Sequence, residues 1–105
     1  MKREPTDFER RVYEHISRVP RGRVTTYAAV GRGIGCRSAQ AIGQALRRNP
    51  FAPEVPCHRV VRSDLSLGGY SGHTEGAELR RKIELLEGEG VEVRDGFVAG
   101  ASVWP

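Results

Sequence analysis

The sequence predicts a single, mainly helical α/β domain built on a helix-turn-helix, and three observations support this class. The chain has 105 residues, 38% of them hydrophobic, which suffices for one modest core over residues 1–105. Two short helical segments joined by a glycine-rich turn lie within its basic half, an arrangement typical of helix-turn-helix domains. A predicted hairpin near the C-terminus adds a small β component.

The first helix is predicted to begin after Thr6. Thr6 and Glu9 have the spacing of a capping box, in which each side chain bonds to the backbone of the other residue. An apolar stripe follows at a spacing of four residues and consists of Phe8, Val12 and Ile16. Pro20, followed by a glycine two residues later, ends the helix.

The second and third predicted helices form the helix-turn-helix. An extended segment leads to Thr26, which caps a short helix over residues 27–30, and the glycines that follow close it. Ser38 caps a third helix over residues 39–48. Three of its side chains can face the core, namely Ile42, Ala45 and Leu46. The rest of its surface is small and polar, so its backbone can approach another surface closely.

The remaining elements are shorter. Two prolines keep residues 51–56 extended. Residues 66–72 are predicted to form a glycine-rich turn, either a small hairpin or a wing. A last helix is predicted over residues 74–87, and a hairpin with an Asp-Gly turn over residues 91–98. The final residues, 103–105, are expected to dock on the surface.

Charge is distributed unevenly along the chain. The formal net charge is +4, but residues 1–48 hold 11 basic and 4 acidic side chains, a net charge of +7. Residues 49–105 hold 6 basic and 9 acidic side chains, a net charge of −3. Such asymmetry indicates a surface that faces a polyanion, although a solvated basic surface would give the same composition.

Two cysteines, Cys36 and Cys57, are too few for a disulfide framework, and no Cys/His spacing typical of zinc is present. The N-terminus is charged rather than apolar, and the longest apolar runs fall far short of the ~20 residues that span a bilayer. We therefore expect reduced thiols, no metal, no membrane partner, and a soluble protein of the cytoplasm, nucleoid or nucleus that is not secreted.

Cys57, which precedes His58, is the candidate reactive group. Residue types alone favour a small buried hydrophobic side chain at such a position. A thiol becomes a nucleophile as the thiolate, which an adjacent imidazole or basic residues can favour, and a remote carboxylate can orient the imidazole. The local sequence decides between these interpretations.

The hexapeptide Pro56 to Val61 (PCHRVV) resembles the signature of the O6-alkylguanine-DNA alkyltransferases. Further segments resemble this family in the same order along the chain: residues 24–27, 37–50, 69–72 and 82–90. The resemblance covers the family's C-terminal domain only. It implies a winged helix-turn-helix that binds duplex DNA through the minor groove and rotates the damaged guanine into a pocket.

The resemblance also implies a catalytic role for five residues. Cys57 would accept the alkyl group from guanine O6 and keep it, so that each molecule acts once. His58 would act as the base through a water molecule, and Glu89 would orient it. Tyr27 would donate a proton to the guanine ring, and Asn49 would hold the active-site turn. No cofactor is implied.

Further residues are assigned to binding by the same resemblance. The base pocket would be lined by Val60, Tyr70, Ser71 and Lys82. The DNA contacts would come from Thr26, Arg37, Ala39, Gln40, Gly43 and Arg47. Small residues on the third helix suit a minor groove only ~6 Å wide. The expected partner is double-stranded DNA containing O6-alkylguanine, bound by a monomer.

One residue departs from the family pattern. The family usually has an arginine in the recognition helix, and the matching residue here is Gln40. Glutamine is uncharged and shorter, although its amide can hydrogen-bond the base left unpaired. We therefore expect weaker base extrusion or a changed choice of lesion.

Three alternative functions stay open at this point. Small alkyltransferase-like proteins resemble this chain in size, lack the cysteine, and mark alkylated DNA for nucleotide excision repair, whose proteins would then be partners. A winged-helix DNA-binding protein with an idle thiol is the second alternative. A cysteine hydrolase using Cys57 and His58 is the third. Since Cys57 is retained, the sequence favours transfer.

Overall fold

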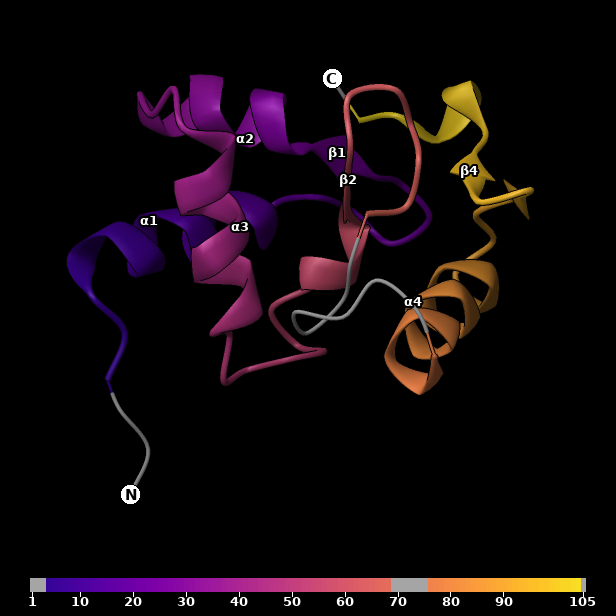
Figure 1. Ribbon diagram of the computed structural model, residues 1–105, viewed down its shortest axis with the longest axis horizontal. Coiled ribbons are helices and arrows are strands. Elements are labelled where there is room, and N and C mark those ends of the chain that lie inside the picture. The colour runs from indigo at the N-terminus through magenta and orange to yellow at the C-terminus, as the bar shows by residue number, and fades with distance from the viewer. Residues whose placement is uncertain (1–3, 69–75, 105) are drawn as a thin grey trace.

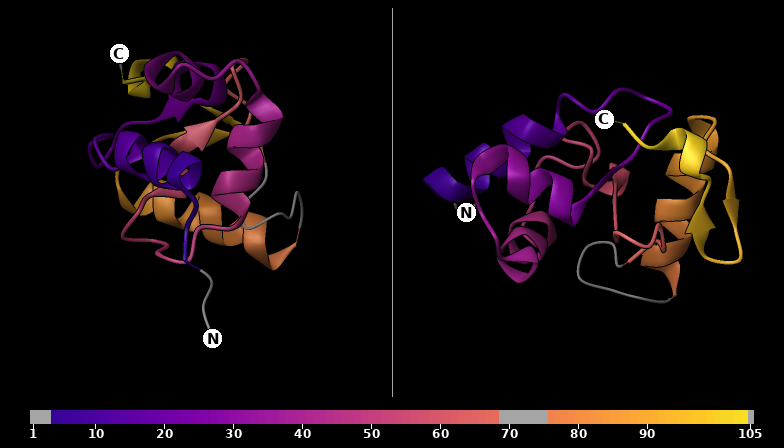
Figure 2. Two further views of the ribbon diagram at one scale, coloured as in Figure 1. Left: turned by 90° about the vertical axis from the view of Figure 1, so that its left-hand side faces the viewer. Right: turned by 90° about the horizontal axis from the view of Figure 1, so that it is seen from above.

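The computed structural model describes residues 4–68 and 76–104. Three helices form one end of the molecule, and these are α1 (Asp7–Ile16), α2 (Tyr27–Ile34) and α3 (Ala39–Arg47). The fourth helix, α4 (Ala77–Gly88), lies at the other end beside the C-terminal hairpin, with the strands β1 and β2 between the two ends (Figures 1 and 2). The predicted mainly helical architecture with a small β component is confirmed.

Helix α1 begins as the sequence predicts. The amide of Glu9 donates to the Thr6 hydroxyl at 3.1 Å, and the amide of Thr6 donates to the Glu9 carboxylate at 2.9 Å, which completes the capping box. Val12 and Ile16 are fully buried on the inner face. The hydroxyl of Tyr13 donates to the carbonyl of Ala45 at 2.7 Å and so ties α1 to α3.

Helices α2 and α3 form the helix-turn-helix, and both begin at the predicted caps. The Thr26 hydroxyl accepts from the Ala29 amide, and the Ser38 hydroxyl accepts from the Ala41 amide. The prediction that α2 closes at residue 30 is wrong, because the helix continues through Gly31 to Ile34. Gly35 then ends it in the left-handed conformation, with φ of 74°.

The central strands are short and parallel. Strand β1 (Thr25–Thr26) pairs with β2 (Val60–Val61), with Thr25 opposite Val60. A 3-10 helix, η1 (Cys57–Arg59), directly precedes β2. On the other side of β1, the amide of Trp104 donates to the carbonyl of Val24 at 2.7 Å, so the end of the chain docks beside the sheet as expected.

Two apolar clusters fill the interior. The first joins α1, α2 and α3 to the segment that contains Cys57 and Val60. The second lies between the strands, α4 and the C-terminal hairpin, and consists of Val24, Val61, Leu67, Leu86, Val91 and Val98. Because η1 and β2 run between these clusters, Cys57 and the residues after it are held from both sides.

The C-terminal half differs from expectation at one helix end. The prediction that the last helix starts at residue 74 is wrong, because Gly76, with φ of 81°, is a turn residue and α4 begins at Ala77. The predicted hairpin is present, as β3 (Val93–Arg94) pairs antiparallel with β4 (Phe97–Val98). No helix within residues 4–68 and 76–104 is long and apolar enough to cross a membrane.

Candidate active site

Cys57 follows a loop whose conformation is held by hydrogen bonds of the Asn49 side chain. The Asn49 amide group donates to the carbonyl of Val55 at 2.8 Å, and its oxygen accepts from the amide of Phe51 at 2.9 Å. These two bonds close the segment between α3 and η1, and the amide of Cys57 then donates to Val55 at 2.9 Å. Cys57 itself is 7% exposed and therefore lies just beneath the surface.

His58 and Glu89 are joined by a hydrogen bond across the molecule. The Nε2 atom of His58 lies 3.0 Å from Oε2 of Glu89, which follows the last turn of α4. With the carboxylate ionised, Nε2 carries the proton in neutral His58, and Nδ1 is left with a free lone pair. Nδ1 is buried and has no hydrogen-bond partner among the residues that the structure describes.

Arg59 completes this cluster, and the sequence reasoning had missed it. Its Nε donates to Oε1 of Glu89 at 2.9 Å, and a terminal nitrogen donates to Oε2 at 2.7 Å, a bidentate pair. Its other terminal nitrogen donates to the carbonyl of Val19 at 2.9 Å. The signal was available, since Arg59 belongs to the PCHRVV string, but its partner lies 30 residues away in sequence.

The electrostatics of this cluster favour an ionised Glu89 and a neutral His58. Burial alone would raise the pKa of the Glu89 carboxyl, but hydrogen bonds from Arg59 and His58 outweigh it and lower the pKa to about 2. Burial lowers the pKa of His58, and the hydrogen bond to Glu89 offsets this only in part. At neutral pH the imidazole can therefore accept a proton.

Lys82 supplies a buried positive charge. It is 0% exposed, and its ammonium donates to the carbonyl of Val60 at 2.9 Å and to the carbonyl of Leu67. Burial lowers the pKa of Lys82 to about 8, while the negative charge of the Cys57 thiolate acts in the opposite direction. The same interaction, viewed from the sulfur, stabilises the thiolate whenever Lys82 is protonated.

Tyr27 and Arg62 approach the loop at Gly68. A Cβ atom built on Gly68 would lie 3.2 Å from the Tyr27 hydroxyl oxygen and 3.6 Å from Cγ of Arg62, and Gly68 has φ of +69°. Burial raises the pKa of Tyr27, and the charge of Arg62 opposes this shift. The phenol is therefore a hydrogen-bond donor at neutral pH. Sequence reasoning had not singled out Arg62.

The other predicted pocket residues are placed less directly. Val60 is fully buried in the first apolar cluster, which also contains Cys57. Tyr70 and Ser71 lie outside the described residues. The structure joins His58 to Glu89 and binds the Lys82 ammonium to the carbonyl of Val60, three residues after Cys57. The assignment of a base pocket stays a prediction.

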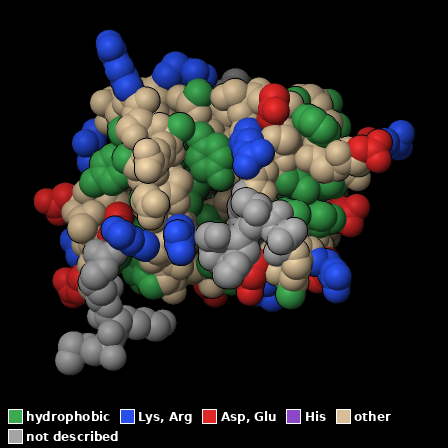
Figure 3. Space-filling model, in the orientation of Figure 1, with side chains coloured by type: hydrophobic (Ala, Val, Ile, Leu, Met, Phe, Trp, Pro, Cys, Tyr) green, Lys and Arg blue, Asp and Glu red, His purple; other side chains and the backbone are tan. Residues whose placement is uncertain are grey.

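The positions predicted to contact DNA lie on or beside α2 and α3. Thr26 uses its hydroxyl as a helix cap. Four of the others are exposed, namely Arg37, Ala39, Gln40 and Arg47. Gly43 is partly exposed, and a Cβ built there would meet nothing within 4 Å. Basic side chains stand over α2 and at one end of α3 on the face shown in Figure 3.

No group of three or more His, Cys, Asp or Glu side chains that could hold a metal ion occurs within residues 4–68 and 76–104. The second cysteine, Cys36, is half-buried in the turn between α2 and α3, where its sulfur accepts from the amide of Ser38 at 3.4 Å. The groups at and beside η1 that can take part in chemistry are the Cys57 thiol, the His58 imidazole and the Lys82 ammonium.

The family model described as "6-O-methylguanine DNA methyltransferase, DNA binding domain" matches residues 7–91. The chain belongs to this family. A methylated-DNA–protein-cysteine methyltransferase of Methanothermobacter thermautotrophicus is 46% identical over 87 residues, which are 83% of this chain and 47% of that protein. A DNA base-flipping protein of Thermus thermophilus is 48% identical over 80 residues, 76% of this chain and 50% of that protein. The chain spans about half the length of these curated relatives.

Two solved structures are similar to this chain in fold. A Mycobacterium tuberculosis OGT structure in complex with DNA has a TM-score of 0.75 and 38% identity, and covers 83% of this chain and 51% of that one. S. pombe Atl1, in complex with damaged DNA containing O6-carboxymethylguanine, has a TM-score of 0.81 and 28% identity. Its match covers 98% of this chain and 99% of Atl1, so it includes the C-terminal hairpin and tail.

Proposed function

We propose that this protein repairs DNA by transferring the alkyl group of O6-alkylguanine in duplex DNA to Cys57, once per molecule. The observation that carries the proposal is the arrangement around His58. Glu89 fixes the proton on Nε2, and the buried Nδ1 faces no protein partner among the described residues. Nδ1 is therefore available to take the thiol proton through a water molecule.

The transfer step is a displacement at the alkyl carbon. The Cys57 thiolate forms a sulfur–carbon bond while the bond from carbon to guanine O6 breaks, and the electron pair passes to the guanine. The Tyr27 hydroxyl, protonated at neutral pH, donates to the guanine ring and so neutralises the leaving group. Lys82 stabilises the thiolate before the attack. The products are an S-alkylcysteine and a restored guanine, and the reaction needs no cofactor.

The names of the relatives support this reaction. The net positive charge of residues 1–48 supports DNA as the substrate. The relatives include methylated-DNA–protein-cysteine methyltransferases, and one structural relative is bound to DNA. Duplex DNA carrying the lesion is therefore the proposed partner, bound by a monomer through exposed residues of α2 and α3. Action on DNA would place the protein in the cytoplasm with the nucleoid, or in the nucleus.

A second candidate function is favoured by one specific observation. The match to S. pombe Atl1 covers nearly all of both chains, whereas the match to the DNA-bound OGT covers half of that protein. A protein of this architecture could bind alkylated DNA and mark it for nucleotide excision repair without transfer. Nucleotide excision repair proteins would then be its partners.

Intact-mass measurement separates these two functions. The protein is mixed with a duplex containing O6-methylguanine, with the Cys57→Ala variant as the control. We expect the wild type to gain the mass of one methyl group and the variant to gain none. Tight binding of the same duplex without any gain in mass would reject transfer and support the sensor function.

A further inference from the structure

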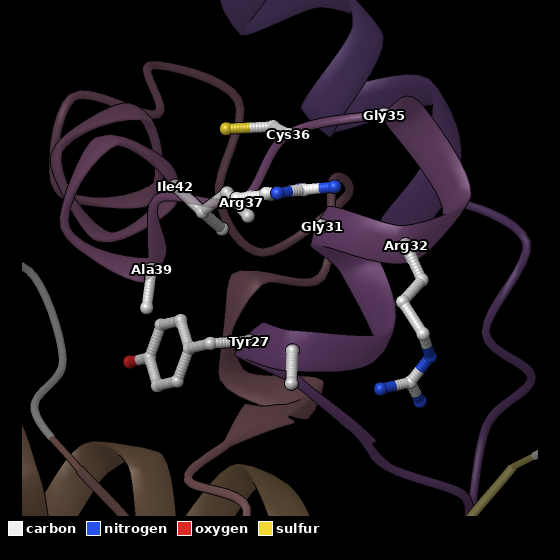
Figure 4. A pocket seen from close by; sticks show the side chains of 9 residues that line it. Tyr27, Gly31, Arg32, Gly35, Cys36, Arg37, Ala39 and Ile42 are labelled. Carbon is white, nitrogen blue, oxygen red and sulfur yellow. The ribbon is translucent and has the colours of Figure 1, made fainter.

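Tyr27 and Arg62 lie at the same edge of the central sheet. Strands β1 and β2 are parallel, and Thr26 lies opposite Val61 in their register. Tyr27 and Arg62 directly follow this pair, so they continue two neighbouring strands at their carboxyl ends, where parallel backbones are about 4.8 Å apart. Figure 4 shows the Tyr27 ring extending from the start of α2, with its hydroxyl oxygen directed away from the helix.

Both side chains approach the same glycine. A Cβ atom built on Gly68 would lie 3.2 Å from the Tyr27 hydroxyl oxygen and 3.6 Å from Cγ of Arg62. The backbone of Arg62 is held by two hydrogen bonds, from its amide to the carbonyl of Ser66 at 3.0 Å and from the amide of Leu65 to its carbonyl at 2.8 Å. The stem of Arg62 is therefore fixed beside the phenol, with its guanidinium at the exposed end.

The guanidinium of Arg62 has no counter-ion in the described part of the chain. It makes neither an ion pair nor a side-chain hydrogen bond with residues 4–68 or 76–104. Asp64 lies two residues away, but its carboxylate accepts from the amide and the hydroxyl of Ser66 at 2.9 and 2.6 Å. Burial and the charge of the Cys57 thiolate both raise the pKa of Tyr27, whereas the charge of Arg62 lowers it.

We propose that Arg62 is a positioning residue for alkyl transfer, which acts through Tyr27 by making its hydroxyl a stronger proton donor to the departing guanine. Such a role rests on the proposed transfer to Cys57. A buried phenol beside a thiolate is a poor acid, because both surroundings disfavour its anion. The fixed positive charge next to it offsets part of this cost without touching the substrate.

The proton transfer accompanies the displacement at the alkyl carbon. As the bond from carbon to O6 breaks, the Tyr27 hydroxyl gives its proton to a ring nitrogen of the guanine, which leaves as a neutral base. The phenolate that forms is stabilised by the Arg62 guanidinium and regains a proton from water after the step. Lowering the free energy of the phenolate therefore lowers the barrier to departure of the guanine.

The test measures methyl transfer from an O6-methylguanine duplex in a single turnover. Arg62→Gln keeps most of the stem on Gly68 and removes the charge, whereas Arg62→Lys keeps both. Because water screens an exposed charge, we expect Arg62→Gln to slow transfer by roughly three- to tenfold and Arg62→Lys to stay within about twofold of the wild type. The control is Arg94→Ala, which removes an exposed arginine from the C-terminal hairpin and should leave the rate unchanged.

The same substitution is then made in the Tyr27→Phe variant, which lacks the hydroxyl. If Arg62 acts through Tyr27, Tyr27→Phe should transfer at the same rate with and without Arg62→Gln. Equal slowing in both backgrounds, or a wild-type rate for Arg62→Gln, would overturn the role of Arg62 alone. A wild type that gains no methyl group would reject the transfer function, and this role with it.

A direct phosphate contact is the alternative role for an exposed arginine at this edge. It is tested by binding an undamaged duplex as a function of salt concentration, where each lost phosphate contact lowers the slope of log K against log salt by about 0.9. We expect Arg62→Gln to keep the wild-type slope. A decrease of about 0.9 would assign the guanidinium to the DNA backbone and overturn its role at Tyr27. Since this duplex carries no lesion, the result does not depend on alkyl transfer.

Discussion

Replacing Glu89 with glutamine tests the charged cluster behind Cys57, because the substitution keeps the shape of the side chain and removes its charge. The difference between the ordinary pKa of 4.5 and the folded-state pKa of about 2 corresponds to about 3 kcal/mol of folding free energy. Solvent reaches part of the cluster, so we reduce this to about 2 kcal/mol. Arg59, with a side chain 16% exposed, would also lose its counter-ion.

We therefore expect Glu89→Gln to destabilise the protein by about 2–4 kcal/mol at pH 7, or to lower Tm by about 10–20 °C. The measurement is urea unfolding of the wild type and the variant, with Glu87→Gln as the control. Glu87 lies in the last turn of α4, two residues before Glu89, and is exposed, so its substitution should change stability by less than about 0.5 kcal/mol.

The stabilisation by Glu89 should depend on pH in a defined direction. The pKa of Glu89 is lowered by folding, so its stabilisation is fully present above pH 4.5 and is lost as the pH falls toward 2. The difference in stability between the wild type and Glu89→Gln should therefore shrink by about 1 kcal/mol between pH 5 and pH 3.5. A constant difference across this range, or a difference no larger than that of the control, would refute the electrostatic account of the cluster.

Three further predictions concern other parts of the structure. Arg62→Ala should raise the pKa of Tyr27 further, because the guanidinium of Arg62 opposes the effect of burial in the wild type and the variant lacks it. Ultraviolet titration of the phenol measures this pKa, and an unchanged value would contradict the prediction. Gly31→Ala should cost about 1–3 kcal/mol, because a Cβ there meets a backbone carbonyl at 2.4 Å, whereas Gly43→Ala, with nothing within 4 Å, should gain up to about 1 kcal/mol; urea unfolding distinguishes them, and equal effects would argue against the packing described. Gln40→Arg should tighten binding to a duplex containing O6-methylguanine, because it adds a charge on the exposed face of α3; fluorescence anisotropy tests this, and no gain or a loss would count against the assigned role of Gln40.

Local sequence signals predicted the starts of α1, α2 and α3 correctly, but not the start of α4. The caps at Thr6, Thr26 and Ser38 all bond to the expected amides, because a cap acts over three residues and depends little on the rest of the fold. The end of α2 was predicted wrongly, since glycine was taken to close the helix. Gly31 remains helical because the turn that follows packs against it, a contact that no local rule contains.

The site could be predicted in part. The PCHRVV string indicated Cys57 and His58, and the resemblance to the family assigned Glu89. The bidentate bond from Arg59 to Glu89 joins residues 30 positions apart and needed coordinates. The same holds for the bonds from the Lys82 ammonium to two backbone carbonyls, since an isolated lysine on a helix is usually solvated.

The most direct test of the central claim is a single-turnover reaction with a duplex whose O6-methyl group is isotopically labelled, followed by tryptic digestion. The two thiols fall in separate peptides, residues 33–37 for Cys36 and residues 49–59 for Cys57. The proposed chemistry predicts that the label reaches one equivalent per protein and lies wholly in the peptide of Cys57. Label in the peptide of Cys36, or a bound duplex that keeps its methyl group, would contradict it.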